Sequence, residues 1–240
     1  MNIVRAKDYE EMTRKAACMI FAQVTLKPDS VLGLATGSTP VGVYRQLASW
    51  CREGDLDFSR IRTVNLDEYV GFSKDHPESY SHFMREHLFD HINIDPQNVH
   101  IPDGLGEETA ECERYDDLIR SLGGVDLQLL GLGHDGHIGF NEPADHFPAG
   151  THMVRLSEST IQANKRFFAD ESQVPRFAYT MGIYDILQSR KVLMIVSGRD
   201  KAEILREAFT GPVTPRVPAS ILQFHKDFTL IADEEALSAF

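Results

Sequence analysis

Short, continuously apolar segments alternate with amphipathic segments along the whole chain, and this alternation constrains the fold more than any other feature. Residues 31–35, 125–130 and 192–196 carry few polar side chains, as strands buried on both faces do. The segments between them, such as residues 8–24, have the periodicity of helices. Apolar strands separated by helices predict an α/β fold: a doubly wound, mostly parallel sheet with helices on both faces, a Rossmann-like three-layer sandwich.

The same pattern gives the expected elements and their order. Strands are expected at residues 2–5, 31–35, 61–66, 125–130, 192–196 and 228–232. Helices are expected at residues 8–24, 40–52, 79–91, 107–122 and 158–168, and a last helix follows residues 197–200 and ends at 209. Asp8 and Glu11 have the spacing of a capping box at the start of the first helix. No repeat or linker-like stretch interrupts the chain, so a single domain over residues 1–240 is expected.

Composition excludes several classes of protein. The formal net charge is −12, and no cluster of Lys and Arg offers the basic face that nucleic-acid binding requires. The apolar runs are too short to cross a membrane, and the N-terminus lacks the apolar core of a signal peptide. Three scattered cysteines, Cys18, Cys51 and Cys112, argue against a disulfide framework. A cytoplasmic protein without nucleic-acid or membrane partners is expected.

Ligands of doubly wound sheets bind beyond the carboxyl ends of the strands. Four such ends carry polar residues. After residue 35 comes Thr36-Gly37-Ser38-Thr39-Pro40, which opens a helix. Free amides at a helix start, together with hydroxyls and a close glycine backbone, predict a phosphate site, but the lysine of a P-loop is missing. The alternative is an ordinary capped helix start.

Another strand end supplies a cation. Lys201 stands near the start of the helix that follows residues 192–196, where its ammonium could reach a phosphate. The alternative is a solvated surface lysine.

Asp67 and Glu68 directly follow the strand expected at residues 61–66. A carboxylate at this place points into the ligand cleft and can serve as a general base. The alternative is that these acids cap a helix or lie in solvent.

The fourth strand end, residues 131–142, matches G-x-G-x-x-G, the pattern of a dinucleotide site. The match is weak, because the stretch also carries Asp135, His137 and Glu142, its acids would hinder a pyrophosphate, and no good helix follows. A histidine with two carboxylates suits proton transfer better, since a carboxylate orients an imidazole and raises its basicity. A metal site built from His134, His137 and one of the two acids is a second alternative, and a glycine-rich turn with incidental polar residues is a third.

Taken together, these segments resemble the glucosamine-6-phosphate deaminase family over nearly the whole chain. The resemblance rests on five stretches in the family's order: residues 34–40, 65–71, 76–80, 131–143 and 164–168. The combination of Asp-Glu-Tyr-Val-Gly with Asp-Gly-His and Phe-Asn-Glu-Pro is specific. It separates this family from the 6-phosphogluconolactonases, which are similar in fold and in phosphate binding.

The resemblance implies a role for each candidate residue. Asp67 would move a proton between C2 and C1 of the sugar, and His137 would open the pyranose ring, with Asp135 and Glu142 tuning and orienting it. The 6-phosphate would be held by Thr36, Gly37, Ser38, Thr39, Arg166 and Lys201. Arg166 would lie on a mobile lid at roughly residues 157–176. Because every step is a proton transfer, neither a metal nor an organic cofactor is expected.

The chain departs from the long members of the family at the site of their allosteric activator, the N-acetylated sugar phosphate. Where they use a serine, an arginine and a lysine, this sequence has Asp145, His152 and Val154. An acid in place of a phosphate-binding hydroxyl should repel the activator. The chain also stops at Phe240 without their C-terminal extension. A non-allosteric enzyme is therefore expected, either a monomer or a small homo-oligomer.

Three other functions stay open on the sequence. A 6-phosphogluconolactonase would need no base at C2, so Asp67 would be dispensable. A sugar-phosphate sensor of a transcriptional regulator would need a helix-turn-helix segment and a basic face. A metal-dependent hydrolase would use His134 with His137 and would lose activity on chelation.

Overall fold

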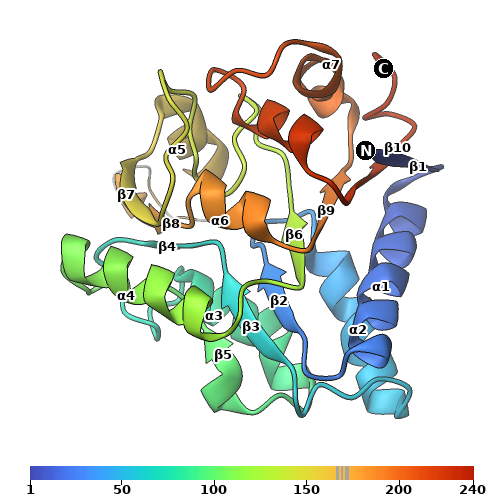
Figure 1. Cartoon of the computed structure of the whole chain (residues 1–240), viewed down its shortest axis with the longest axis vertical. Helices are drawn as coiled ribbons and strands as arrows, with labels where there is room; N and C mark the ends of the chain where they lie inside the picture. Colours follow the sequence, from blue (N-terminus) through green and yellow to red (C-terminus); the bar gives the residue numbers. More distant parts are fainter. Residues whose placement is uncertain (166–167, 169, 171–172) are drawn as a thin grey trace.

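The fold is built around a fully parallel, seven-stranded sheet (Figure 1). The computed structural model describes all residues except 166–167, 169 and 171–172. The strand order is β1-β10-β9-β6-β2-β3-β5. The strands are β1 Asn2–Ala6, β2 Val31–Leu34, β3 Arg62–Asn65, β5 Val99–His100, β6 Leu127–Leu130, β9 Lys191–Val196 and β10 Phe228–Asp233. The predicted doubly wound α/β sheet is confirmed.

Helices cover both faces of this sheet. They are α1 Tyr9–Leu26, α2 Val41–Glu53, α3 Tyr80–His87, α4 Glu108–Ser121, α5 Glu158–Asn164, α6 Ile183–Gln188 and α7 Ala202–Thr210. Short 3₁₀ helices lie at Phe89–His91, Pro96–Asn98, Arg199–Lys201 and Pro218–Phe224. One apolar core joins α1, α2 and α3 to the sheet, and a second joins α4, α6 and α7 to its other face. The three-layer arrangement follows from these two cores.

The first helix begins at the residue that the sequence indicates. The Asp8 side chain accepts a hydrogen bond from the Glu11 N–H at 2.9 Å. The Glu11 carboxylate in turn accepts from the Lys7 N–H at 2.7 Å, one residue before the usual capping-box donor. Because α1 begins here, Tyr9 in its first turn lies beside the loop that follows β2.

A second, antiparallel sheet was not predicted. It has the order β4-β8-β7 and contains β4 Asp67–Tyr69, β8 Phe177–Thr180 and β7 His152–Arg155. The chain leaves β3 and after one residue enters β4, where Asp67 pairs with Thr180. The position of Asp67 is thus fixed by the pairing of β4 with β8.

Two predicted helices are shorter than expected. The helix expected at residues 79–91 ends at His87 and continues as a 3₁₀ helix at Phe89–His91. The helix expected at 158–168 ends at Asn164, and part of the remaining stretch lies outside the described residues.

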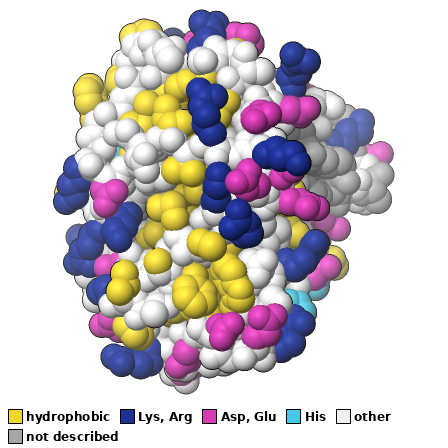
Figure 2. Space-filling view, turned by 90° about the vertical axis from the view of Figure 1, so that its right-hand side faces the viewer, with side chains coloured by type: hydrophobic (Ala, Val, Ile, Leu, Met, Phe, Trp, Pro, Cys, Tyr) yellow, Lys and Arg dark blue, Asp and Glu magenta, His cyan; other side chains and the backbone are white. Residues whose placement is uncertain are grey.

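Within the part of the chain that the structure describes, no helix is both long and apolar enough to cross a membrane. Figure 2 shows one face of the molecule, on which Lys and Arg side chains are interspersed with Asp, Glu and apolar ones.

Candidate active site

The four polar strand ends meet in one cavity. Strands β9, β6, β2 and β3 are neighbours in the sheet, so the segments that follow them share one edge. A cavity of about 370 Å³ opens there, lined by residues from each of the four segments: Thr36, Gly37, Ser38, Thr39, Asp67, Gly133, His134, His137, Ser197, Asp200 and Lys201. A larger cavity of about 870 Å³ lies beside α3 and the loop before α4. The smaller cavity contains the acid–base groups.

The loop after β2 is held in place by two tyrosines. The Tyr44 hydroxyl lies between the backbone N–H and C=O of Ala35. The Tyr9 hydroxyl accepts from the Gly42 N–H at 3.0 Å and donates to the Thr39 carbonyl at 3.1 Å. Gly37 has a φ of +91°, a conformation that favours glycine. The loop thus presents its hydroxyls and the start of α2 to the cavity.

The two acids after β3 have different environments. Asp67 is 6% exposed and lines the cavity. Glu68 is 1% exposed, and its carboxylate accepts hydrogen bonds from the backbone N–H groups of Tyr69, Tyr80 and Ser81, each at 2.9 Å. Glu68 therefore secures the first turn of α3, as the alternative interpretation allowed for one of these acids, whereas Asp67 faces the ligand space.

Burial changes the acidity of Asp67. It raises the pKa of Asp67 to about 8, the nearby charge of Glu68 adds to the rise, and the positive charge of His137 opposes it. A carboxyl group with a pKa close to neutrality is suited to accept a proton and return it.

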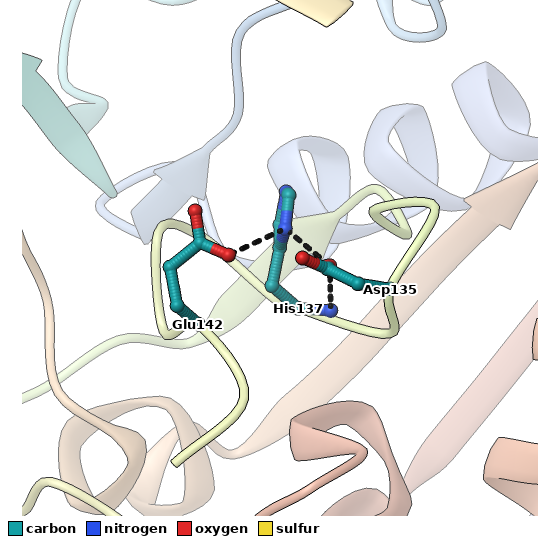
Figure 3. Close-up of side chains that lie close together, drawn as sticks. All are labelled: Asp135, His137 and Glu142. Carbon is teal, nitrogen blue, oxygen red and sulfur yellow. Dashed lines mark hydrogen bonds and ion pairs between the residues drawn. The ribbon is translucent and has the colours of Figure 1, made fainter. Parts of the chain in front are cut away.

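Asp135, His137 and Glu142 converge in the loop after β6 (Figure 3). His137 Nδ1 lies 2.7 Å from Asp135 Oδ1 and 3.6 Å from Glu142 Oε2. Burial would lower the pKa of His137, but the hydrogen bonds and charges of the two acids raise it to about 9. With Nδ1 directed at the carboxylates, Nε2 is the ring nitrogen left to exchange protons with a ligand.

The Asp135 carboxyl keeps its negative charge beside this imidazole. Burial favours its neutral form, but the hydrogen bond and positive charge of His137 outweigh burial and hold the pKa of Asp135 well below its usual range. The pair is therefore an imidazolium next to a carboxylate.

Backbone contacts fix the loop that carries this cluster. The Asn141 side chain donates to the carbonyls of Ile138 and Met181, both at 2.9 Å, and the Thr180 hydroxyl accepts from the Phe140 N–H at 3.0 Å. Thr180 is the last residue of β8, and Met181 directly follows it. The antiparallel sheet thus ties the His137 loop to Asp67, which pairs with Thr180.

His134 lies apart from the cluster. Its Nε2 contacts Asp200 Oδ2 at 2.7 Å on the exposed rim of the cavity. The metal site considered from the sequence needed His134 together with His137, and the structure does not bring them to one centre. Atoms of Asp135, His137 and Glu142 do lie within 4.8 Å of one another. Metal binding to these three residues would displace the imidazole proton, so activity after EDTA treatment separates proton transfer from metal-dependent chemistry.

The dinucleotide interpretation also finds no support in the geometry. Residues 131–142, all of them described, form turns and an isolated bridge rather than the start of a helix. The pyrophosphate site of a Rossmann domain requires a helix N-terminus at this point.

The predicted phosphate ligands are brought together as far as they are described. Thr36, Gly37, Ser38 and Thr39 line one side of the cavity. Lys201 lines it as well, and its half-buried ammonium donates to the Leu132 carbonyl at 2.8 Å. Arg166 lies outside the described residues, as does part of the lid expected at residues 157–176.

Sequence reasoning missed the residues that support the site. Tyr9, Tyr44 and Thr180 act only through contacts between segments far apart in the chain, so no local pattern marks them. Thr160 is different. It is 4% exposed, and its hydroxyl donates to Glu142 Oε1 at 2.6 Å. Its position three residues after Ser157, the N-cap of α5, is the one signal that could have suggested it.

Comparison with known proteins finds one family along nearly the whole chain. The family model of glucosamine-6-phosphate isomerases and 6-phosphogluconolactonases matches residues 7–231. The chain is 58% identical over 232 residues to the glucosamine-6-phosphate deaminase of Lachnoclostridium phytofermentans, covering 96% of this chain and 98% of that protein. It is 53% identical to glucosamine-6-phosphate deaminase 2 of Bacillus subtilis, covering 98% and 96%.

Two solved structures are similar to this chain, one in sequence and fold and the other in fold alone. The structure of a monomeric glucosamine-6-phosphate deaminase superposes with a TM-score of 0.97 at 46% identity, covering 100% of both chains. A 6-phosphogluconolactonase from Thermotoga maritima superposes with a TM-score of 0.75 at 23% identity, covering 97% of this chain and 99% of that one, which shows a common fold.

Proposed function

This chain belongs to the family of glucosamine-6-phosphate isomerases and 6-phosphogluconolactonases, and we propose that its cavity converts glucosamine 6-phosphate and water into fructose 6-phosphate and ammonia. The observation that carries this choice within the family is the buried carboxyl of Asp67 in the same cavity as His137. Moving a hydrogen between two carbons requires such a base, whereas hydrolysis of a lactone does not.

The phosphate anchors the substrate. The hydroxyls and amides of Thr36, Gly37, Ser38 and Thr39 bind the 6-phosphate at the start of α2, and the Lys201 ammonium supplies a positive charge. Arg166 completes this set in the proposal, on the sequence resemblance alone. Binding energy from the phosphate, remote from C1 and C2, orients the reacting carbons.

Ring opening comes first. The His137 imidazolium donates its Nε2 proton to the ring oxygen and then takes the proton of the C1 hydroxyl, which restores its charge. Asp135 holds Nδ1 during both transfers, and Glu142 lies close by. The open-chain aldehyde makes the hydrogen on C2 acidic.

Asp67 then carries that hydrogen. As a carboxylate it takes the C2 proton to give an enolamine, and as a carboxylic acid it returns the proton to C1. Water adds at C2 and ammonia leaves, giving fructose 6-phosphate. Each positioned acid or base typically contributes ~10²–10⁴-fold to the rate.

The reaction is formally a hydrolysis of a carbon–nitrogen bond and fits the catabolism of N-acetylglucosamine in the cytoplasm. The cysteines Cys18, Cys51 and Cys112 are all free thiols, which agrees with a reducing compartment. We expect a monomer or small homo-oligomer, in line with the structural relative that is described as monomeric.

Substrate preference tests the proposal. Purified protein should release ammonia from glucosamine 6-phosphate, with a much lower kcat/KM for glucosamine, which lacks the phosphate. Hydrolysis of 6-phosphogluconolactone without ammonia release from the amino sugar would instead favour the second activity of the family.

The pH dependence of kcat/KM is expected to be bell-shaped. Asp67 must be ionised to act as a base, so activity rises as the pH passes about 8. His137 must be protonated to act as an acid, so activity falls as the pH passes about 9. Initial rates across the pH range should place the optimum on the mildly alkaline side of neutrality. An optimum near pH 5 would contradict these assignments.

The enzyme is expected to be insensitive to the family's allosteric activator. Asp145, at a position where long members have a serine, pairs with Arg216, and His152 Nδ1 lies 3.0 Å from the Gly150 carbonyl. The Asp145 carboxylate therefore stands where the long members of the family would bind the phosphate of the activator. Initial-rate kinetics should be hyperbolic, and N-acetylglucosamine 6-phosphate should not change them. Clear activation by that compound would refute the expectation.

A further inference from the structure

His134 is the one candidate residue of the sequence analysis to which the proposed reaction gives no role. Its Nε2 lies 2.7 Å from Asp200 Oδ2, and the two side chains are 55% and 62% exposed. The partners come from different strand ends, since His134 follows β6 and Asp200 lies in the 3₁₀ helix Arg199–Lys201 that follows β9. Both line the cavity that contains the proposed phosphate site. The pair therefore has to be explained in terms of that cavity.

Asp200 carries a charge that opposes phosphate binding. It directly precedes Lys201 in the chain and lines the same cavity as Thr36 and Ser38. Burial would raise the pKa of Asp200, but the hydrogen bond with His134 and the charge of Lys201 lower it, so the side chain is a carboxylate at neutral pH. A negative charge at this place repels a phosphate and attracts the cation that should bind the phosphate.

His134 restrains this carboxylate. An ionised carboxylate only accepts hydrogen bonds, so the Nε2 atom of His134 carries the hydrogen of the contact whether the ring is neutral or charged. The Lys201 ammonium donates to the Leu132 carbonyl at 2.8 Å, in the same loop as His134. The loop after β6 thus binds the acid and the neighbouring cation at two different points.

We propose that His134 is a positioning residue for the phosphate site, which holds the Asp200 carboxylate at the cavity rim and so limits its competition with the phosphate for the charge of Lys201. The ligand chemistry that this role requires is a phosphate group. The inference deepens the proposed function and rests on it for the identity of the substrate that carries the phosphate.

The proposal predicts opposite effects for the two partners. His134→Ala releases the Asp200 carboxylate, so the Kd for inorganic phosphate and the KM for glucosamine 6-phosphate should both rise by about 2–5-fold, as expected for one exposed charge. Asp200→Ala removes the acid, so both constants should stay the same or fall. Because neither side chain acts on the reacting carbons, kcat should stay within about twofold of the wild-type value.

The double variant separates the effect of charge from that of structure. If the released carboxylate causes the loss, adding Asp200→Ala to His134→Ala should restore at least the wild-type constants. If the pair only tied two loops together, Asp200→Ala alone would be as damaging as His134→Ala, and the double variant would restore nothing. His134→Gln, which keeps a hydrogen-bond donor at Nε2, should stay close to the wild type.

An ion pair on α7 gives a matched control. Arg206 Nη2 lies 2.8 Å from Glu203 Oε2, the side chains are 52% and 78% exposed, and both residues lie outside the cavity lining. Arg206→Ala should therefore leave the Kd and the KM unchanged. Ionic strength gives a second readout, because concentrated salt screens exposed charges and should reduce the difference between the wild type and His134→Ala.

Binding of inorganic phosphate is followed by NMR titration of the substrate-free protein, so it does not depend on turnover. Equal phosphate affinity in the wild type and His134→Ala, or weaker phosphate binding in Asp200→Ala than in the wild type, would overturn the inference. A wild type that makes no fructose 6-phosphate, but whose variants change phosphate binding as described, would refute the proposed function and leave the role of His134 standing.

Discussion

Replacing Asp67 by Asn is expected to lower kcat by about 10²–10⁴-fold, the usual contribution of a positioned base. The amide is similar in shape but cannot take the C2 proton. Since the backbone of Asp67 is held in β4 opposite Thr180 of β8, the substitution should leave the cavity and phosphate binding intact. Steady-state rates with glucosamine 6-phosphate measure the loss, and an unchanged KM would show that binding survives.

The same variant is expected to be more stable than the wild type at alkaline pH. In the folded protein Asp67 keeps its proton up to a pH of about 8, whereas in the unfolded chain it ionises near its ordinary pKa of about 3.9. Between these values unfolding releases a proton, so the stability of the wild type falls as the pH rises. Asn has no such proton, and the gain at pH 9 should be on the order of 2–5 kcal/mol.

Denaturant unfolding at pH 5 and pH 9 measures this gain. The neighbouring acid gives a matched control: Glu68→Gln should destabilise the protein, because the Glu68 carboxylate accepts three backbone hydrogen bonds at α3. A fully active Asp67→Asn enzyme, or one less stable than the wild type at both pH values, would contradict the role given to this carboxyl.

Gly133→Ala is expected to be nearly as damaging to activity as loss of His137 itself. A Cβ on Gly133 would lie 2.4 Å from three atoms of the His137 ring, so the ring would have to move. Moving it takes Nδ1 away from Asp135 and Nε2 away from the substrate. We expect kcat to fall by about 10²-fold or more, with the fold retained.

Gly131→Ala is the matched control in the same loop. A Cβ there meets no atom within 4 Å, so His137 should stay in place and kcat should be kept. Steady-state kinetics of both variants would measure kcat, and their crystal structures would show whether the His137 ring has moved. Full activity in Gly133→Ala would mean that the imidazole is not held where ring opening needs it.

The sequence predicted the sheet and the edge that binds the ligand for a definite physical reason. Strands such as β9 are apolar at nearly every position because both faces are covered, and the polar residues that follow them stand out. Neighbouring parallel strands then bring residues 36–39, Asp67 and His137 to one edge without any knowledge of side-chain contacts.

The antiparallel sheet escaped prediction because its strands are short and one of them, β7, is only partly buried. Strand β7 is half-exposed, and β4 follows β3 after a single residue, so the two look like one segment. Because the sequence did not reveal this sheet, it could not show that Asp67 lines the cavity whereas Glu68 binds the start of α3. The Thr160 hydroxyl of α5 escaped for a related reason: its partner, Glu142, lies 18 residues earlier in the chain.

Product analysis tests the central claim most directly. Purified, EDTA-treated protein would be incubated with glucosamine 6-phosphate, and fructose 6-phosphate and ammonia would both be quantified. Equal amounts of the two products, lost in Asp67→Asn, are the predicted result. Absence of both products, or activity that requires added metal, would contradict the account.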